Sequence, residues 1–385
     1  MDVYSVIGIL PAFLSFFLTI FFKKNTEIKR KYLYIIMFSV FAFLFAFRAA
    51  SVGTDTQYYI NRYLTIYNYG ITRFNQIYSS EIGFTLYNLM LTKIFGANYQ
   101  WLFIISGIFI MFSFGRFLYK HAKADVLTLM LFALAMFPRS LNILRTEIAV
   151  AICLFGIEYA QQGSLAKAVT VCILGATFHL SVLLFIPVIF ILNSKSSLRY
   201  PEKIALIVGL IIFLYVGWRT LITFVPLFSK YRVYDGAQAS YNYRITAYSI
   251  YVFYGLYLVF SVFIYFYFKK HADEMTPLIF ESKYGQLWGD FQLESILYLV
   301  FVLGTIVSQF NWILSRITDV FFIGYILYIP FATKVLFSKI VKPNLSSLAV
   351  IIVFVLLFGV SINAVHANIA GCYPYEFVRI DEVFK

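Results

Sequence analysis

Tyr32-Leu-Tyr-Ile-Ile-Met-Phe-Ser-Val-Phe-Ala-Phe-Leu-Phe-Ala-Phe47 contains no charged residue, and Arg48-Ala-Ala-Ser-Val-Gly-Thr-Asp-Thr56 follows it directly. An apolar run that ends abruptly in a cation, a glycine and a carboxylate is typical of a membrane helix that reaches the aqueous surface. Gly53 permits a positive φ, and Thr54 and Asp55 can bond their own backbone. A turn is therefore predicted at the end of this helix.

The rest of the chain has the same apolar character. Hydrophobic residues make up 61% of the sequence and charged residues 13%, where soluble domains have about 25% charged residues. Apolar runs recur from end to end, so a single integral membrane domain covering residues 1–385 is predicted. The net charge of +13 comes largely from lysines in short loops, which is the positive-inside pattern and does not indicate a nucleic-acid partner.

The apolar runs predict an all-α, polytopic membrane protein with about twelve transmembrane helices, some of them short and broken. A bilayer core of about 30 Å needs about 20 apolar helical residues, or fewer where helices are broken. The predicted spans lie near residues 3–22, 32–47, 99–119, 126–137, 143–160, 166–178, 180–192, 204–218, 246–268, 291–309, 317–337 and 348–366. Residues 166–192 fit either one long span or two short helices that meet at His179. Two helices are preferred because they keep the basic loop 193–203 on the cytoplasmic side.

This orientation places both termini and two large loops, residues 48–98 and 219–245, on the outer side. The first loop contains a short apolar segment, residues 80–95, which carries Glu81 and Lys93. It is too short and too charged for a crossing, so we expect an interfacial or re-entrant helix.

Arginines concentrate on the predicted outer side, whereas lysine dominates the predicted cytoplasmic loops. Arginine binds phosphate and diphosphate in a bidentate manner, and a charge beside a span is costly unless it is paired or functional. Five arginines are candidate ligands for a diphosphate: Arg48, Arg145, Arg232, Arg244 and Arg316. The alternative is a structural role, with Arg145 paired to Glu147 and Arg316 paired to Asp319.

Three other sets of residues suggest chemistry. Arg145 follows Pro138 at the predicted start of a helix, where free backbone N–H groups attract anions. His179 lies within a membrane run, and with Asp55 and Glu147 it is a candidate general base. Tyrosines in the loop 219–245 offer faces for sugar rings or belong to an interfacial aromatic belt. The tyrosines in question are Tyr234, Tyr241 and Tyr243.

Several common catalytic motifs are missing from the sequence. It has no P-loop, no GxSxG, no HExxH and no Asp-x-Asp, and its three cysteines are scattered. We therefore expect no cofactor and no metal site. A reactant that carries its own activated group, such as a lipid diphosphate sugar, suits such a protein.

The chain resembles the EpsG-like branch of the Wzy-type polymerases. The resemblance rests on Gly53-Thr-Asp-Thr56, on Arg145-Thr-Glu-Ile-Ala149, on the segments around His179 and Arg316, and on Pro374-Tyr375. It implies a GT-C-like glycosyltransferase at the outer face of a bacterial inner membrane. Such an enzyme joins undecaprenyl-diphosphate-linked repeat units into O-antigen, capsule or exopolysaccharide. Membrane lipids, a chain-length regulator and a flippase are the further partners that the resemblance implies.

Three other functions stay open at this point. An O-antigen ligase-like transferase predicts a larger outer loop than any here. A transporter or flippase of the lipid-linked unit needs charges along a central path, whereas these gather on one side. A membrane acyltransferase would use His179 as its base.

Overall fold

A computed structural model describes residues 2–22, 25–78, 81–193, 197–224, 248–309, 314–337, 343–367 and 371–379. Helices account for the regular structure of these residues, and the β-pairing found among them is an isolated bridge between Arg48 and Phe377. This agrees with the prediction of an α-helical membrane protein. The chain forms two compact units, Met1–Ile189 with Asn344–Lys385, and Phe190–Pro343.

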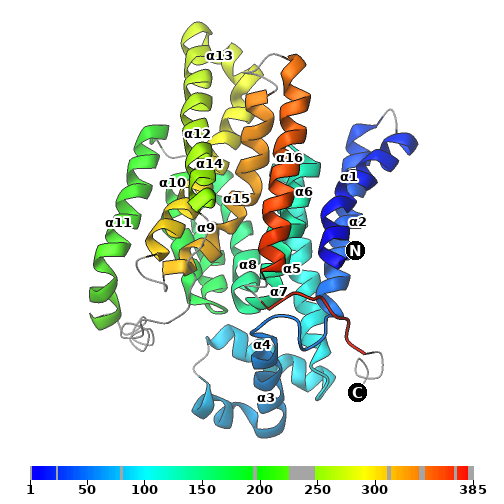
Figure 1. Cartoon of the computed structure of the whole chain (residues 1–385). Helices are drawn as coiled ribbons and strands as arrows, with labels where there is room; N and C mark the ends of the chain where they lie inside the picture. Colours follow the sequence, from blue (N-terminus) through cyan, green and yellow to red (C-terminus); the bar gives the residue numbers. More distant parts are fainter. Residues whose placement is uncertain are drawn as a thin grey trace. The chain divides into compact units, whose positions relative to one another are not determined.

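The first unit contains most of the helices (Figure 1). In chain order they are α1 (Val3–Phe21), α2 (Thr26–Ala46), α3 (Thr56–Ile77), α4 (Ile82–Phe95), α5 (Gln100–His121), α6 (Asp125–Leu131), the π-helix η1 (Phe132–Met136), α7 (Phe137–Asn142), α8 (Leu144–Gln161), α9 (Leu165–Ala176), the 3₁₀-helix η2 (Leu180–Leu184) and α16 (Pro343–His366). Helix α10 (Phe185–Leu192) leads into the second unit.

The second unit consists of α11 (Tyr200–Phe224), α12 (Tyr248–Glu274), α13 (Pro277–Phe280), the π-helix η4 (Glu281–Gly285), α14 (Gln286–Ser308) and α15 (Ser315–Val335). Aromatic side chains fill the contacts between these helices. Tyr298 stacks on Tyr328 with 4.8 Å between ring centroids, and the Tyr257 hydroxyl lies 2.8 Å from the Thr333 hydroxyl. The Tyr257 hydroxyl therefore finds a polar partner inside an apolar interior, as buried tyrosines usually do.

Helices occupy all twelve predicted spans, but several extend beyond the apolar run. Helix α2 begins at Thr26, six residues earlier than predicted, and includes the basic residues Lys29, Arg30 and Lys31. Hydropathy detects the part of a helix that suits lipid, whereas the helix itself continues for as long as its hydrogen bonds do.

Six segments of the described chain are long and apolar enough to cross a membrane: Val3–Phe21, Gln100–His121, Asp125–Asn142, Tyr200–Gly217, Pro277–Ser308 and Ser315–Val335. Helix α8 has 18 residues but carries Arg145, Glu147 and Glu158, and α9 and η2–α10 are short. Twelve crossings, a single domain and a GT-C-like arrangement stay predictions.

The break at His179 favours two short helices over one long span. Helix α9 ends at Ala176, and His179 has an extended backbone with φ −155° and ψ 118° before η2 begins. The chain then runs back along α9, because Val182 lies beside Gly175 and Ile189 lies beside Gly156, which also adjoins Cys172. Residues 166–192 therefore form two short helices, as preferred, while their crossing of the membrane stays a prediction.

Helix α3 is an element that we did not predict, since its residues were assigned to an outer loop. It buries Tyr59, Ile60, Tyr63 and Ile66, while polar residues such as Gln57 and Asn61 are exposed between them. A search for continuous apolar runs passes over a helix that has a single apolar face. The interfacial or re-entrant segment proposed for residues 80–95 is indeed a helix, α4, although its depth in a membrane is a prediction.

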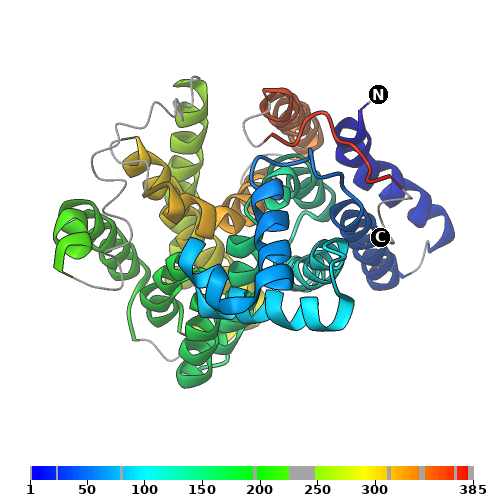
Figure 2. The ribbon, with the colours of Figure 1, turned by 90° about the horizontal axis from the view of Figure 1, so that it is seen from below.

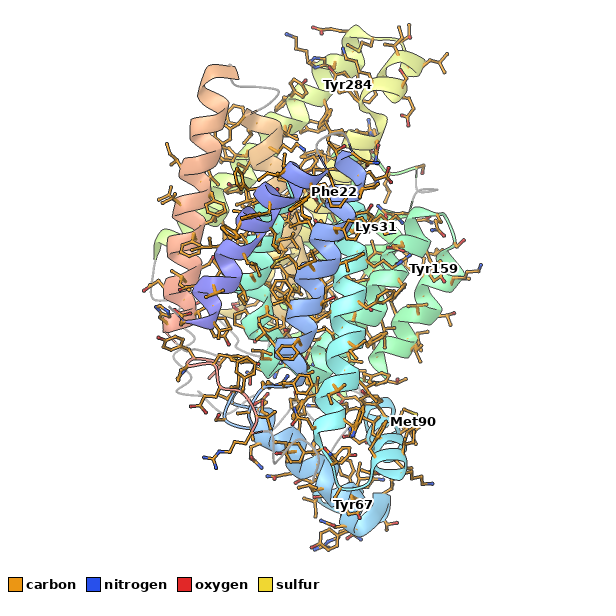
Figure 3. All side chains as sticks on the ribbon, turned by 90° about the vertical axis from the view of Figure 1, so that its right-hand side faces the viewer. Phe22, Lys31, Tyr67, Met90, Tyr159 and Tyr284 are labelled. Atoms are coloured by element: carbon orange, nitrogen blue, oxygen red, sulfur yellow. The ribbon has the colours of Figure 1, made fainter. Side chains whose placement is uncertain are left out.

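The first unit has two ends, which labelled residues identify. Lys31 and Tyr159 lie at one end and Tyr67 and Met90 at the other (Figure 3). Helices α3 and α4 lie across the second end, as the view from below shows (Figure 2). We name this second end the α3–α4 end. It corresponds to the predicted outer side.

Substituting single cysteines tests this sidedness. Lys31→Cys should react with a membrane-impermeant maleimide from the cytoplasmic side alone, and Tyr67→Cys from the outer side alone, because both positions are exposed at opposite ends. Wild-type protein serves as the control, since its three cysteines are buried. Labelling of Tyr67→Cys from the cytoplasm would contradict the orientation.

Gly324 of α15 lies close to the backbone of α14, and it gives a test of the packing in the second unit. A methyl group at Gly324 would lie 2.5 Å from the Leu297 carbonyl oxygen and 2.6 Å from the Tyr298 nitrogen. Gly324→Ala should destabilise the protein by about 1–3 kcal/mol, because backbone cannot move aside easily. Gly289→Ala, also in this helix pair, meets no atom within 4 Å and should raise stability by about 0.5–1 kcal/mol. Thermal unfolding in detergent compares the two variants.

Candidate functional site

The Gly53-Thr-Asp-Thr56 block is tied to two distant segments. Gly53 has φ 95°, as the predicted turn requires, and its N–H donates to the Gly371 carbonyl at 2.8 Å. The Asn142 side-chain oxygen accepts from the Thr54 hydroxyl at 2.9 Å and from the Asp55 N–H at 2.8 Å. The block therefore joins α7 to residues 371–379, which we name the strap.

The strap runs beside the end of α2 and covers Arg48. Ala49 N–H donates to the Glu376 carbonyl and Val378 N–H to the Phe47 carbonyl, each at 2.9 Å. Tyr4 donates its hydroxyl proton to the Cys372 carbonyl at 2.7 Å, and the Cys372 thiol donates to the Pro138 carbonyl at 3.0 Å.

Arg48 itself is 1% exposed and lies between two aromatic rings. Its guanidinium carbon is 4.3 Å from the Phe45 centroid and 4.2 Å from the Phe103 centroid, and Nη1 donates to the Phe45 carbonyl at 3.0 Å. Burial lowers the pKa of Arg48 to about 10, so the side chain is still charged at neutral pH. In this position it stabilises the end of α2, and a diphosphate contact by Arg48 stays a prediction.

Glu81, Arg145 and His179 converge at the α3–α4 end from three separate elements. Arg145 Nη1, at the start of α8, lies 2.7 Å from Glu81 Oε2, just before α4. His179 Nδ1, in the turn after α9, lies 3.7 Å from Glu81 Oε1. The side chains of Arg145, Glu81 and His179 are 20%, 8% and 8% exposed, respectively. We name these three residues the Glu81 cluster.

A backbone hydrogen bond fixes the position of α4 relative to the turn that carries His179. Gly83 N–H donates to the Thr177 carbonyl at 2.8 Å, which joins the first turn of α4 to the turn that carries His179. A methyl group at Gly83 would lie 2.8 Å from that carbonyl oxygen, so glycine is needed for this close approach.

Aromatic residues of α3 and α4 surround the arginine of the cluster. The Arg145 guanidinium carbon is 5.8 Å from the Phe84 centroid. Tyr59 also faces Arg145: burial raises the pKa of the Tyr59 hydroxyl, and the Arg145 charge opposes that rise. Arg62 is a second buried arginine nearby, 4.3 Å from the Tyr58 centroid and 5.1 Å from the Tyr78 centroid.

The partner of Arg145 differs from the one that we considered from the sequence. Arg145 pairs with Glu81, which is 64 residues away, and not with Glu147. Residues two apart on a helix point to different faces, so helix geometry alone disfavours a pair between Arg145 and Glu147. Glu147 is 1% exposed, its carboxylate oxygens accept no hydrogen bond from the described residues, and Arg139 is the charge that acts on it.

The remaining predicted site residues are distributed as follows. Asp55 is exposed at the start of α3. Arg316 belongs to the second unit, where its Nη1 lies 3.2 Å from Asp319 Oδ2, so the predicted pair forms within one turn of α15. Five predicted residues lie outside the described residues: Arg232, Arg244, Tyr234, Tyr241 and Tyr243.

Gly83→Ala tests whether the approach of α4 to the His179 turn matters. The added methyl group would collide with Thr177 backbone atoms, which cannot move as a flexible side chain does. We expect loss of the protein's activity, since displacement by about 1 Å can cost about 100-fold in rate. Gly359→Ala, which meets no atom within 4 Å, is the control and should behave as the wild type. Equal activity of the two variants would show that the close approach is not needed.

Comparison with known proteins agrees with the resemblance seen in the sequence. The model of the EpsG family matches residues 31–377. No curated protein and no solved structure matches. The matched region includes most of α2, all of α3 to α16, all three residues of the Glu81 cluster and most of the strap. Because the match covers most of the sequence, this chain belongs to the EpsG family.

Proposed function

We propose that this protein is a polysaccharide polymerase of the bacterial inner membrane. It joins oligosaccharide repeat units carried on undecaprenyl diphosphate, and its site faces the periplasm or exterior. The single observation that carries the proposal is the Glu81 cluster, in which a partly buried cation, a carboxylate and an imidazole meet at the α3–α4 end of an EpsG-family chain. These groups provide the two functions that glycosyl transfer from a lipid diphosphate needs.

The first function is stabilisation of the leaving group. The acceptor hydroxyl oxygen forms a bond to the donor's anomeric carbon, and the bond from that carbon to the diphosphate oxygen breaks with its electron pair. Negative charge therefore develops on the diphosphate, and an arginine in a low-dielectric site stabilises it. We assign this role to Arg145, with Arg48, Arg232, Arg244 and Arg316 as further candidates.

The second function is removal of the hydroxyl proton. Among the three candidate bases, His179 is the one placed beside the Arg145–Glu81 pair. A neutral imidazole accepts the proton near physiological pH. Asp55 and Glu147 stay as alternatives, and Tyr234, Tyr241 and Tyr243 are proposed to contact sugar rings. A chain-length regulator and a flippase are proposed partners.

Arg145→Ala tests the proposal in reconstituted membranes. Purified protein in lipid nanodiscs is given a lipid-linked repeat unit, and products are resolved by gel electrophoresis. The wild type should give a ladder of long chains, and Arg145→Ala should lower the rate by about 100-fold or more, since one lost charge-stabilising donor costs about that much. Arg316→Ala should also abolish long chains while the protein still inserts.

Arg116→Ala is the matched control for Arg145→Ala. It also removes an arginine that lies 2.7 Å from a buried glutamate, here Glu158, but at the opposite end of the first unit. It should keep wild-type chain lengths. Unmodified substrate with the wild-type protein would reject the polymerase and favour transport, and transfer to a different acceptor would favour a ligase.

A further inference from the structure

Glu81 is the one residue of the Glu81 cluster that the sequence did not suggest for the site, and its two oxygens face different partners. Oε2 lies 2.7 Å from Arg145 Nη1 and Oε1 lies 3.7 Å from His179 Nδ1. A carboxylate has two oxygens and about four acceptor positions, so it can serve both. The first distance is that of a charge-assisted hydrogen bond, whereas the second is within ion-pair range but longer than a hydrogen bond.

The groups around the cluster make the charge of Glu81 important for both partners. Charged and titratable groups from two further elements act around the Glu81 carboxylate. They are Arg145 on α8, and Tyr59 and Arg62 on α3. Arg145 shares the Glu81 carboxylate with His179, so its positive charge disfavours a further positive charge on the imidazole, and Arg62 adds a second cation near Arg145 and Glu81. Glu81 is the opposing negative charge that these contacts provide, and burial strengthens its effect.

We propose that Glu81 is a positioning residue that couples diphosphate binding at Arg145 to proton acceptance by His179. The inference rests on the proposed function and extends it. Without substrate, Glu81 neutralises Arg145. When a diphosphate contacts Arg145, the phosphate oxygens neutralise that cation, and the charge of Glu81 then acts on His179. The imidazole becomes a stronger base at the moment when the donor is in place.

The same geometry orients the imidazole for the reaction. With Nδ1 carrying its proton toward Glu81 Oε1, the Nε2 lone pair is available to the acceptor hydroxyl. The proton moves from that hydroxyl to Nε2 as its oxygen bonds to the anomeric carbon, and the carbon–oxygen bond to the diphosphate breaks. His179 then carries the positive charge, and Glu81 stabilises it.

Histidine NMR tests the coupling without depending on polymerisation. The chain has four histidines, so ¹³C-histidine labelling gives few signals, and loss of one signal in His179→Gln assigns His179. Inorganic diphosphate should raise the pH at which the His179 signal titrates by about one unit, since an opposite charge at this distance has that effect. The signals of His271 and His366 should not respond.

Four variants distinguish the coupling from a purely structural role of Glu81. Glu81→Gln should lower the His179 midpoint by about one pH unit and weaken the response to diphosphate. Arg145→Ala should remove the response, while Glu158→Gln, which changes a buried glutamate at the opposite end, should keep it. Glu81→Asp retains the charge and should keep part of the response, which guards against a Glu81→Gln variant that fails to fold.

The polymerisation assay provides a second readout. In Glu81→Gln the kcat should fall by at least about 100-fold, and the acidic limb of the kcat–pH profile should move to lower pH, because the base is then weaker. The coupling is overturned, even if chains form, by either of two results. In the first, diphosphate does not change the His179 midpoint of the wild type. In the second, the His179 midpoint of Glu81→Gln equals that of the wild type. An intact NMR response without polymer rejects the polymerase function and leaves the coupling standing.

Discussion

The cost of burying a charge determines how the α3–α4 end is built. An ion away from water is tolerated where an opposite charge or polar groups compensate it. Arg145 meets this requirement through Glu81, which lies just before α4, and so α8 and the start of α4 must meet. Arg48 is compensated differently, by two aromatic rings and one carbonyl. The Arg145–Glu81 pair also helps to determine the position of His179, since the turn that carries His179 is bonded to α4 through Gly83.

The opposite end of the first unit shows which part of this arrangement is special. There Arg116 lies 2.7 Å from Glu158 and Lys120 3.8 Å from it, so a buried carboxylate again compensates cations. The cations at that end are 43% and 45% exposed, whereas Arg145 is 20% exposed. The α3–α4 end also brings an imidazole to the same carboxylate. Pairing of a cation with a buried carboxylate therefore occurs at both ends, and the shared histidine is what distinguishes the α3–α4 end.

Apolar runs sufficed to predict the positions of the helices, because a membrane segment must be both apolar and helical. They failed for α3, whose apolar face alternates with polar residues, and for the basic start of α2. Within the candidate site, Arg145 and His179 were found because a charge or an imidazole beside an apolar run is unusual. Glu81 was missed, since its partners lie 64 and 98 residues away and no local pattern connects them.

The strap links segments from opposite ends of the sequence, with Tyr4 bonded to a residue 368 positions later. A ribosome releases α1 and α2 long before Cys372 exists, so these helices wait in the bilayer while the intervening helices insert. Contacts at such separation are the slowest to form. Docking of the strap onto Tyr4 and Gly53 is therefore a late step in the folding of the first unit.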